Sequence, residues 1–268
     1  MRWSAKRAED SVTRYVITGA SSGLGRGFAR ALVAHGDSVW GVARRGEQLQ
    51  ELSKTLGRDR FSFTVCDVGR LESVRTTASA MRDAGFEPDV VVLNAGINPE
   101  RLGAPFDIET FQEVLQINAV GALAWVHEFL PAFRARGRGQ FVAISSSAAY
   151  RGDARWVAYG ASKAALSRAF EALRGRHASD GLVFTTVHLG AVVTGMGSEA
   201  RSPFRLTEKQ AVTRTLAAIE RGATSVTIPR YLRVIVEAMR MLPDPLFSRM
   251  VAGALAPTNG AAPAPARK

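Results

Sequence analysis

A glycine-rich turn near the N-terminus constrains the fold of this chain more than any other feature of its sequence. Residues 14–17 have the apolar character of a short buried strand, and residues 23–35 have the apolar periodicity of a helix. Between them, residues 18–25 read Thr-Gly-Ala-Ser-Ser-Gly-Leu-Gly. Glycines in such a turn let the backbone approach a phosphate group, whose charge is stabilised by the amides and the dipole at the helix N-terminus. The order strand, turn, helix therefore predicts a nucleotide site in an α/β fold.

Strand and helix patterns continue to alternate along the chain, which predicts parallel strands joined by helical crossovers. Further strands are expected over residues 38–43, 61–65, 90–93, 140–144, 182–188 and 225–228, and further helices over residues 47–56, 71–84, 107–133, 207–221 and 230–242, with another around 159–163. With 268 residues, 46% of them hydrophobic, the chain can form one domain with a sizeable core. We expect an α/β fold with a doubly wound parallel sheet in three layers. This domain covers residues 12–255, between a mobile segment 1–11 and a disordered Pro/Ala-rich tail 256–268.

Tyr159 and Lys163 are four residues apart in a segment expected to be helical, so they lie on one face with their polar tips close together. A phenol has a pKa of about 10, and a neighbouring ammonium group favours its ionised form. The pair can then exchange protons near neutral pH if Lys163 stays charged. The same spacing, taken alone, also fits an amphipathic helix with a surface lysine and a half-buried tyrosine.

Two further motifs accompany this pair. The apolar residues 140–144 lead into Ser145, Ser146 and Ser147, a serine cluster at the carboxyl end of a strand, where binding sites of open α/β sheets lie. Residues 94–96, Asn-Ala-Gly, follow another apolar strand. With the glycine-rich turn and Tyr-x-x-x-Lys, the set resembles the classical short-chain dehydrogenase/reductase family over about residues 12–230. The resemblance implies a Rossmann-type fold and hydride transfer that interconverts a carbonyl and an alcohol.

The resemblance also implies a catalytic set of Asn118, Ser146, Tyr159 and Lys163. Tyr159 would be the general acid and base, and Lys163 would tune it and bind the nicotinamide ribose. The family's usual separation of serine and tyrosine selects Ser146, with Ser145 as second candidate, to orient and polarise the substrate carbonyl. Asn118 stands in an apolar stretch and needs hydrogen-bond partners if it is buried. By resemblance it would hold a water that links Lys163 to solvent; capping or packing is the alternative.

The strand over residues 38–43 ends in Arg44 and Arg45 instead of the acidic residue that would accept hydrogen bonds from a ribose 2′-hydroxyl. A guanidinium group can bind a 2′-phosphate through charge-assisted hydrogen bonds. We therefore predict NADP(H) in preference to NAD(H), although a solvated strand end would show the same arginines. The residues expected to contact the cofactor, most of them by resemblance, are Gly19, Ser21, Ser22, Gly23, Leu24, Gly25, Arg44, Arg45, Asp67, Val68, Asn94, Ala95, Gly96, Tyr159, Lys163, Gly190, Val192 and Thr194.

Three further parts of the sequence bear on the expected site. By resemblance Asp67 contacts the adenine amino group, with a turn or helix cap as the competing role. Leu189 stands where the family usually has a proline before Gly190. Residues 195–206 are rich in Gly, Ser and Pro, and the family has a mobile lid over the substrate at this place.

Composition limits the other classes of function. The net charge of +11 suggests a partner of opposite sign, such as nucleic acid, a membrane surface or a phosphate-bearing cofactor, but the sequence has no recognised nucleic-acid-binding motif. The single cysteine, Cys66, excludes an internal disulfide, and the four histidines lack metal-ligand spacing, so we expect no metal. Since no apolar run reaches a membrane span and no secretion signal is visible, we expect a cytoplasmic protein.

The predicted helix over residues 230–242 has one polar stripe on an otherwise apolar surface. The stripe consists of Arg230, Arg233, Glu237 and Arg240. We expect the apolar surface to pack on the core, to line a hydrophobic substrate pocket or to dock on a membrane, in that order. The expected partners are a hydrophobic small molecule and, by resemblance, a second or further copies in a homodimer or homotetramer. A noncatalytic NADP(H)-binding regulatory or scaffold protein is the alternative, which the complete catalytic set disfavours.

Overall fold

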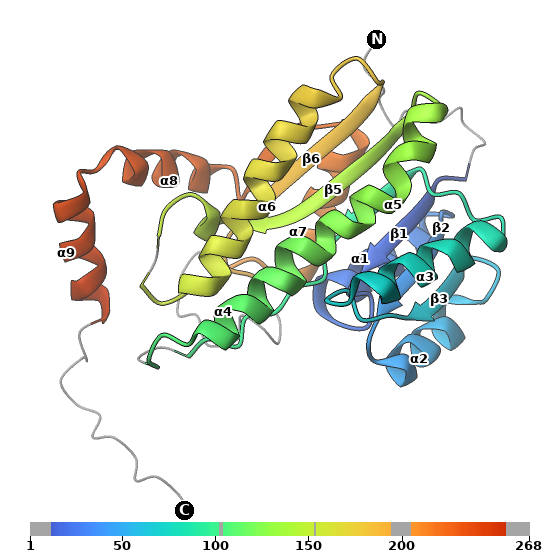
Figure 1. The fold of residues 1–268 in the computed structure, drawn as a ribbon, viewed down its shortest axis with the longest axis horizontal. Helices are drawn as coiled ribbons and strands as arrows, with labels where there is room; N and C mark the ends of the chain where they lie inside the picture. Colours follow the sequence, from blue (N-terminus) through green and yellow to red (C-terminus); the bar gives the residue numbers. More distant parts are fainter. Residues whose placement is uncertain (1–11, 102–103, 153, 194–204, 256–268) are drawn as a thin grey trace, which may run out of the picture.

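A computed structural model of the protein describes residues 12–101, 104–152, 154–193 and 205–255. The segments expected to be mobile or disordered, 1–11 and 256–268, lie outside these residues, as does most of the expected lid. The described chain forms a seven-stranded sheet in the order β3-β2-β1-β4-β5-β6-β7, in which all neighbouring strands are parallel (Figure 1). The strands are β1 Arg14–Thr18, β2 Ser38–Ala43, β3 Phe61–Val65, β4 Val90–Leu93, β5 Gly139–Ser146, β6 Leu182–Leu189 and β7 Ser225–Ile228.

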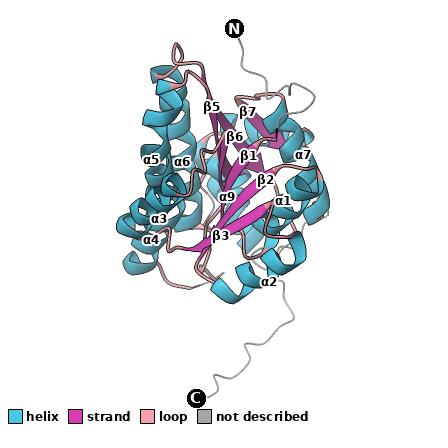
Figure 2. Cartoon of the chain, turned by 90° about the vertical axis from the view of Figure 1, so that its right-hand side faces the viewer, coloured by secondary structure: helices cyan, strands magenta, loops and turns pink. Residues whose placement is uncertain are grey.

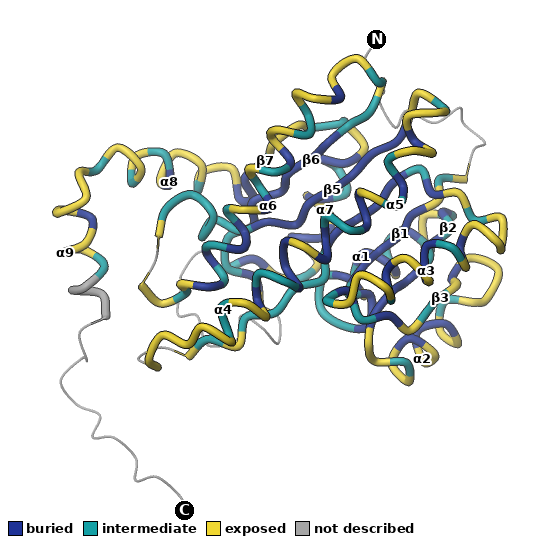
Figure 3. The backbone as a smooth tube through the Cα atoms, viewed as in Figure 1, coloured by how far each residue is buried: buried dark blue, intermediate teal, exposed yellow. Residues whose placement is uncertain are grey.

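Helices cover both faces of this sheet (Figure 2). One layer contains α1 Gly23–Ala34, α2 Gly46–Leu56 and α7 Glu208–Glu220, and the other contains α3 Leu71–Asp83, α4 Ile108–Leu115, α5 Gly121–Ala135 and α6 Val157–Arg176. Two hydrophobic clusters fill the spaces between sheet and helices, one on each face. Because both faces are covered, the strands need apolar residues at consecutive positions, as in Val90–Leu93, where all four residues are buried. Strands β1 and β5 are likewise mostly buried (Figure 3). The predicted doubly wound α/β/α fold is confirmed.

Successive strands are added to the sheet first on one side of β1 and then on the other, since β1 pairs with β2 on one side and with β4 on the other. From β1 the chain crosses first to β2 and β3, and then returns past β1 to β4 and on to β7. The helices α1 and α2 lie on one face and α3 to α6 on the other, and a pocket opens between the start of α1 and the loop after β4. Ligands of open α/β sheets bind at such a switch point, beyond the carboxyl ends of the strands.

The long helix expected over residues 107–133 is present but contains an irregular turn. Asp107 caps α4 as predicted, and its side chain accepts a hydrogen bond of 2.8 Å from the Thr110 amide. The π-helical turn Gln116–Val120 then joins α4 to α5, and α5 continues past Pro131 to Ala135. Gly121 follows this turn at a close approach, since a Cβ there would lie 2.2 Å from the Val68 carbonyl oxygen. Turns of this kind are frequent at functional sites.

Beyond β7 the chain forms two helices, α8 Tyr231–Met241 and α9 Asp244–Leu255, which extend beside the main body (Figure 1). Val236 packs on the core side of α8, whereas Val234 and Met241 are 73% and 86% exposed. The expected packing on the core is thus found for one side of α8, and another apolar side is exposed. In the part of the chain that the structure describes, no helix combines the length and apolar character needed to cross a bilayer.

The close packing of the glycine-rich turn gives a test of the fold. A Cβ on Gly25 would lie 2.2 Å from the Gly19 carbonyl oxygen and 2.7 Å from Asn94 Nδ2. We expect Gly25→Ala to lower the free energy of unfolding by about 3 kcal/mol or more, because the clash involves backbone. In the control Gly175→Ala, a Cβ would meet nothing within 4 Å, and the change should raise stability by up to about 1 kcal/mol. Urea unfolding followed by circular dichroism measures both, and equal stabilities for the two variants would contradict the packing argument.

Candidate active site

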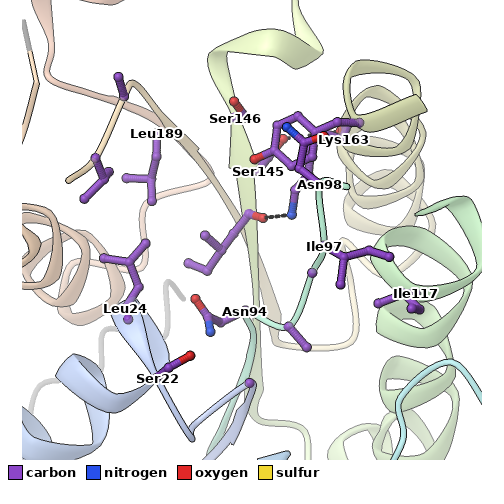
Figure 4. Close-up of a pocket in the computed structure, with 18 of the residues that line it drawn as sticks. Ser22, Leu24, Asn94, Ile97, Asn98, Ile117, Ser145, Ser146, Lys163 and Leu189 are labelled. Carbon is purple, nitrogen blue, oxygen red and sulfur yellow. Dashed lines mark hydrogen bonds between the residues drawn. The ribbon is translucent and has the colours of Figure 1, made fainter. Parts of the chain in front are cut away.

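A pocket of about 1,140 Å³ opens at the carboxyl ends of β1, β2, β4, β5 and β6. In Figure 4, Ser22, Leu24 and Asn94 lie towards its glycine-rich end, and Ser145, Ser146 and Lys163 lie where β5 faces α6. Nearly all of the predicted site residues line this pocket: Gly19, Ser21, Ser22, Gly23, Leu24, Arg44, Arg45, Asp67, Val68, Asn94, Ala95, Gly96, Ser146, Tyr159, Lys163, Gly190 and Val192. Gly25 and Asn118 lie behind its wall, and Thr194 lies outside the described residues.

The glycine-rich turn is shaped by left-handed glycines. Gly19 has a φ of 73° and Gly23 a φ of 48°, a region in which residues with a side chain are strained. The Gly19 amide donates a hydrogen bond of 2.7 Å to the Val42 carbonyl, which ties the turn to β2. The turn leads directly into α1, so the unpaired amides of that helix face the pocket where an anionic group would be stabilised.

A hydrogen-bond network joins this turn to the loop after β4. Thr18 Oγ1 accepts hydrogen bonds of 3.0 Å from the amides of Asn94 and Ala95 and donates to the Val92 carbonyl at 3.4 Å. The side chain of Asn94 donates to the Thr18 carbonyl at 3.0 Å. Two loops that are more than seventy residues apart in sequence are thereby held in one arrangement.

The predicted arginine pair lies at the rim of the pocket. Arg45 donates from Nε and Nη2 to Ser21 Oγ, at 3.2 and 3.0 Å, and from Nη2 to Ser22 Oγ. Arg44 and Arg45 are both exposed, and both line the pocket beside the turn. Two guanidinium groups and two serine hydroxyls at this edge form a site suited to a dianionic phosphate.

Asp67 has the turn role that residue type alone suggested, and it also lines the pocket. Its Oδ1 accepts a hydrogen bond of 3.0 Å from the Gly69 amide, which closes a local turn after β3. Its own amide donates a hydrogen bond of 3.2 Å to Ser73 Oγ. Since one carboxylate oxygen forms the turn, the other remains available to a group in the pocket.

Lys163 is buried beneath the pocket, and its Nζ donates a hydrogen bond of 2.8 Å to the Ile144 carbonyl at the end of β5. Burial disfavours the ammonium form and lowers the pKa of Lys163 to about 8. The side chain is therefore mostly protonated at neutral pH but can release a proton within the physiological range.

The pKa of the Tyr159 phenol shifts in the direction opposite to our prediction. Nζ of Lys163 lies 5.7 Å from the centre of the Tyr159 ring, which confirms the shared helical face. However, burial of the phenol raises the pKa of Tyr159, and a hydrogen bond with the Ser146 side chain only partly opposes this rise. The prediction of a lowered pKa was wrong for this arrangement because it counted the nearby charge and not the loss of hydration. In this arrangement the phenol keeps its proton at neutral pH.

The two candidate serines have different surroundings. The Ser145 hydroxyl is buried, 3.3 Å from the Lys163 carbonyl and 2.8 Å from Ser167 Oγ, so it links β5 to α6. The Ser146 hydroxyl is partly exposed to the pocket, bonds to Tyr159, and accepts from the Ala148 amide at 3.2 Å. Ser146 thus has the position expected of a group that contacts a substrate, and Ser145 that of a structural residue.

Asn118 is fully buried in the π-helical turn, and its side chain is occupied by protein partners. Its Oδ1 accepts from the Ile97 amide at 2.8 Å, and its Nδ2 donates to the Ile97 carbonyl at 2.9 Å and to Ser162 Oγ at 3.0 Å. The packing role that we kept as an alternative is therefore present. The side-chain amide has no free donor left for the predicted water.

Several pocket residues were not predicted. Ile97, Asn98, Trp156, Tyr231 and Leu232 also line the pocket. They come from the loop after β4, the start of α6 and the start of α8, and only for the helix over residues 230–242 was lining of a substrate pocket among the expected roles. Asn98 is the polar member of this group, and its Oδ1 is buried and has no hydrogen-bond partner among the described residues.

His188 lies on β6 beside the serine cluster and is buried. Its ring lies 4.6 Å from that of Tyr150, whose hydroxyl is 2.9 Å from Thr227 Oγ1. Burial lowers the pKa of His188 to about 4, although a hydrogen bond with the Ser146 backbone acts in the opposite direction. The imidazole is therefore neutral across the physiological range and adds no charge behind Ser146.

The sequence and the fold are both similar to those of known dehydrogenases. The profile described as short chain dehydrogenase matches residues 13–204. An uncharacterized oxidoreductase of Myxococcus xanthus is 34% identical over 249 residues, which cover 90% of this chain and 96% of that protein. These matches include the glycine-rich turn and the Tyr159 helix.

Solved structures of short-chain dehydrogenases have a similar fold. A short chain dehydrogenase from Burkholderia cenocepacia in complex with NADP has a TM-score of 0.77 and 27% identity, over 90% of this chain and 98% of that one. A short-chain dehydrogenase from Streptomyces avermitilis has a TM-score of 0.74 and 25% identity, over 91% of this chain and 99% of that one. The likeness therefore extends over the whole sheet and the pocket at its edge.

The neutral His188 gives a prediction about stability and pH. The unfolded chain binds a proton at this residue near pH 6.5, whereas the folded chain binds it only near pH 4, so stability falls as pH drops through this window. We expect this group to remove up to about 3 kcal/mol between pH 7 and pH 4. His188→Gln should be less sensitive to acid by this amount, whereas the exposed control His127→Gln should follow the wild type. Parallel pH profiles for His188→Gln and wild type in urea unfolding would contradict the prediction.

Proposed function

This chain belongs to the short-chain dehydrogenase family, and we propose that it uses NADP(H) to interconvert a carbonyl and an alcohol on a hydrophobic small molecule. The oxidoreductase class follows from the family. The observation that best supports the proposed cofactor and reaction is that Ser146, Tyr159 and Lys163 line the same pocket as the glycine-rich turn and the arginine pair.

The pocket fits a dinucleotide. A Cβ on Gly96 would lie 3.0 Å from Asn118 Oδ1 and 3.4 Å from Lys163 Nζ, so the absence of a side chain lets this loop lie close to both residues. At the other end the amides of the glycine-rich turn and α1 suit a pyrophosphate. We propose that Asn94–Gly96, Gly190 and Val192 contact the nicotinamide half and that Asp67 and Val68 contact the adenine. When bound, the nicotinamide supplies or accepts the hydride.

The preference for NADP(H) is supported by the position of Arg44 and Arg45. Arg45 already contacts Ser21 and Ser22, which gives a phosphate a prearranged set of donors at the edge of the turn. No carboxylate follows β2 at this point, since Arg44, Arg45 and Gly46 are the next residues. The Burkholderia cenocepacia relative is also described with NADP.

In the reductive direction we propose that Tyr159 donates its proton to the substrate carbonyl oxygen while Ser146 holds that oxygen. The raised pKa of Tyr159 favours its protonated form, which is the form needed for donation. Lys163, whose pKa is lowered to about 8, then supplies a proton to restore the phenol. The role of Asn118 in this scheme is to fix the loop at Ile97 against α6.

The substrate half of the pocket is mainly apolar. Ile97, Trp156, Leu189 and Leu232 line it, and they support a hydrophobic substrate more than a sugar or an amino acid. A noncatalytic NADP(H)-binding protein remains the alternative function, and turnover distinguishes the two. No observation on the described residues favours the alternative.

A cofactor titration tests the arginine pair without knowledge of the substrate. We expect Arg45→Ala to raise the Kd for NADPH about 10- to 100-fold, the effect of losing a charge-assisted hydrogen bond, and to change the Kd for NADH less than about threefold. Arg30→Ala, on the exposed side of α1, is the matched control. Nicotinamide fluorescence measures all six dissociation constants, and tighter binding of NADH than NADPH by the wild type would overturn the cofactor preference.

Turnover measurements test the proposed role of Tyr159 as the proton donor. Tyr159→Phe removes only the hydroxyl, and we expect it to lower kcat about 100-fold or more on ketones and aldehydes with apolar substituents, with NADPH binding nearly unchanged. The measurement is NADPH oxidation followed by absorbance over a panel of such substrates. A folded Tyr159→Phe protein that retains the wild-type rate would exclude Tyr159 as the proton donor.

A further inference from the structure

The first turn of α6 lacks the side-chain cap that helices usually have. Its N-cap residue, Trp156, makes no capping hydrogen bond, and the first turn contains no acidic residue. The first amides of a helix have no partner within the helix and need an acceptor from elsewhere. Tyr159 occupies this turn, so its placement depends on how these amides are satisfied.

Glu100 supplies the acceptor from a distant part of the chain. Its Oε1 accepts a hydrogen bond of 3.0 Å from the Ala158 amide, and its Oε2 accepts one of 2.9 Å from the Tyr159 amide. The two residues that donate are 58 and 59 positions further along the chain. A carboxylate at a helix N-terminus is also favoured by the helix dipole. One side chain thus replaces the missing cap with two charge-assisted hydrogen bonds.

The loop that bears Glu100 is fixed at its other end as well. Ile97 is bound through both its amide and its carbonyl to Asn118, whose Nδ2 also donates to Ser162 on α6. The Asn94–Gly96 segment precedes this point and lines the pocket. Glu100 and Asn118 therefore connect the loop to α6 at two places.

We propose that Glu100 is a positioning residue for Tyr159, and that its carboxylate holds the tyrosine backbone in register with the Asn94–Gly96 loop. The proposal rests on the proposed function for its effect on turnover. Glu100 does not contact the reacting atoms through this arrangement, because both carboxylate oxygens face backbone amides. Its action is on the geometry of proton donation, a step that is sensitive to small displacements.

The first test requires no substrate. Amide hydrogen exchange at Ala158 and Tyr159, resolved by NMR, should become about 10-fold faster or more in Glu100→Ala. Glu100→Gln retains one carbonyl oxygen as acceptor and should give an intermediate increase. Glu113→Gln makes the same chemical change on the exposed side of α4 and should leave these amides unchanged. Wild-type exchange rates in a folded Glu100→Ala protein would overturn the capping role.

The second test measures turnover. We expect Glu100→Ala to lower kcat about 10-fold and Glu100→Gln to lower it less, while the Kd for NADPH stays within about threefold of the wild type. A loss that appeared only in NADPH binding, or an unchanged kcat in Glu100→Ala, would overturn the positioning role. If the wild type bound NADPH but reduced none of the carbonyl panel, the proposed function would fail, and the exchange rates would still decide whether Glu100 caps α6.

Discussion

The buried ammonium group of Lys163 is the interaction on which the rest of the site depends. Its loss of hydration is offset by the hydrogen bond to the Ile144 carbonyl near the end of β5. Removing either partner would leave a buried polar group unsatisfied. The hydroxyls of Ser145 and Ser167 surround the Lys163 carbonyl and add further links between α6 and β5. Polar contacts therefore fix α6 on the sheet in one orientation. An apolar interface would allow several orientations.

The two halves of the pocket are joined by loops, and the joining contacts are mostly between side chain and backbone. Thr18 and Asn94 bind the glycine-rich turn to the loop after β4, and Asn118 binds that loop to α6. The π-helical turn at Gln116–Val120 has a place in this arrangement, because Asn118 lies within it and reaches both Ile97 and Ser162. A dinucleotide that spans the pocket would contact elements already fixed relative to one another, which lowers the entropy lost on binding.

The sequence predicted the elements whose signals are local and left out the contacts that are not. The glycine-rich turn, the apolar strands and the four-residue spacing of Tyr159 and Lys163 have periodicities or turn residues that define them within a few positions. Glu100 has no such signal, because its partners are 58 and 59 residues away. The direction of the Tyr159 pKa shift was also out of reach, since it depends on burial by segments that converge only in the fold. Residue type alone did indicate packing as one possible role of Asn118, and the structure shows its hydrogen-bond partners.

The order of strands has a consequence for how this chain reaches its fold. Strand β1, made early in synthesis, pairs with β4 about 75 residues later, and α1 packs against α7, which ends at Glu220. The part of the sheet face and of α1 that α7 covers therefore stays exposed until most of the chain has left the ribosome. Long-range pairing of this kind slows folding and exposes apolar surface to aggregation. A nascent chain that stops before α7 would hold the complete glycine-rich turn and the catalytic helix and yet be a substrate for chaperones.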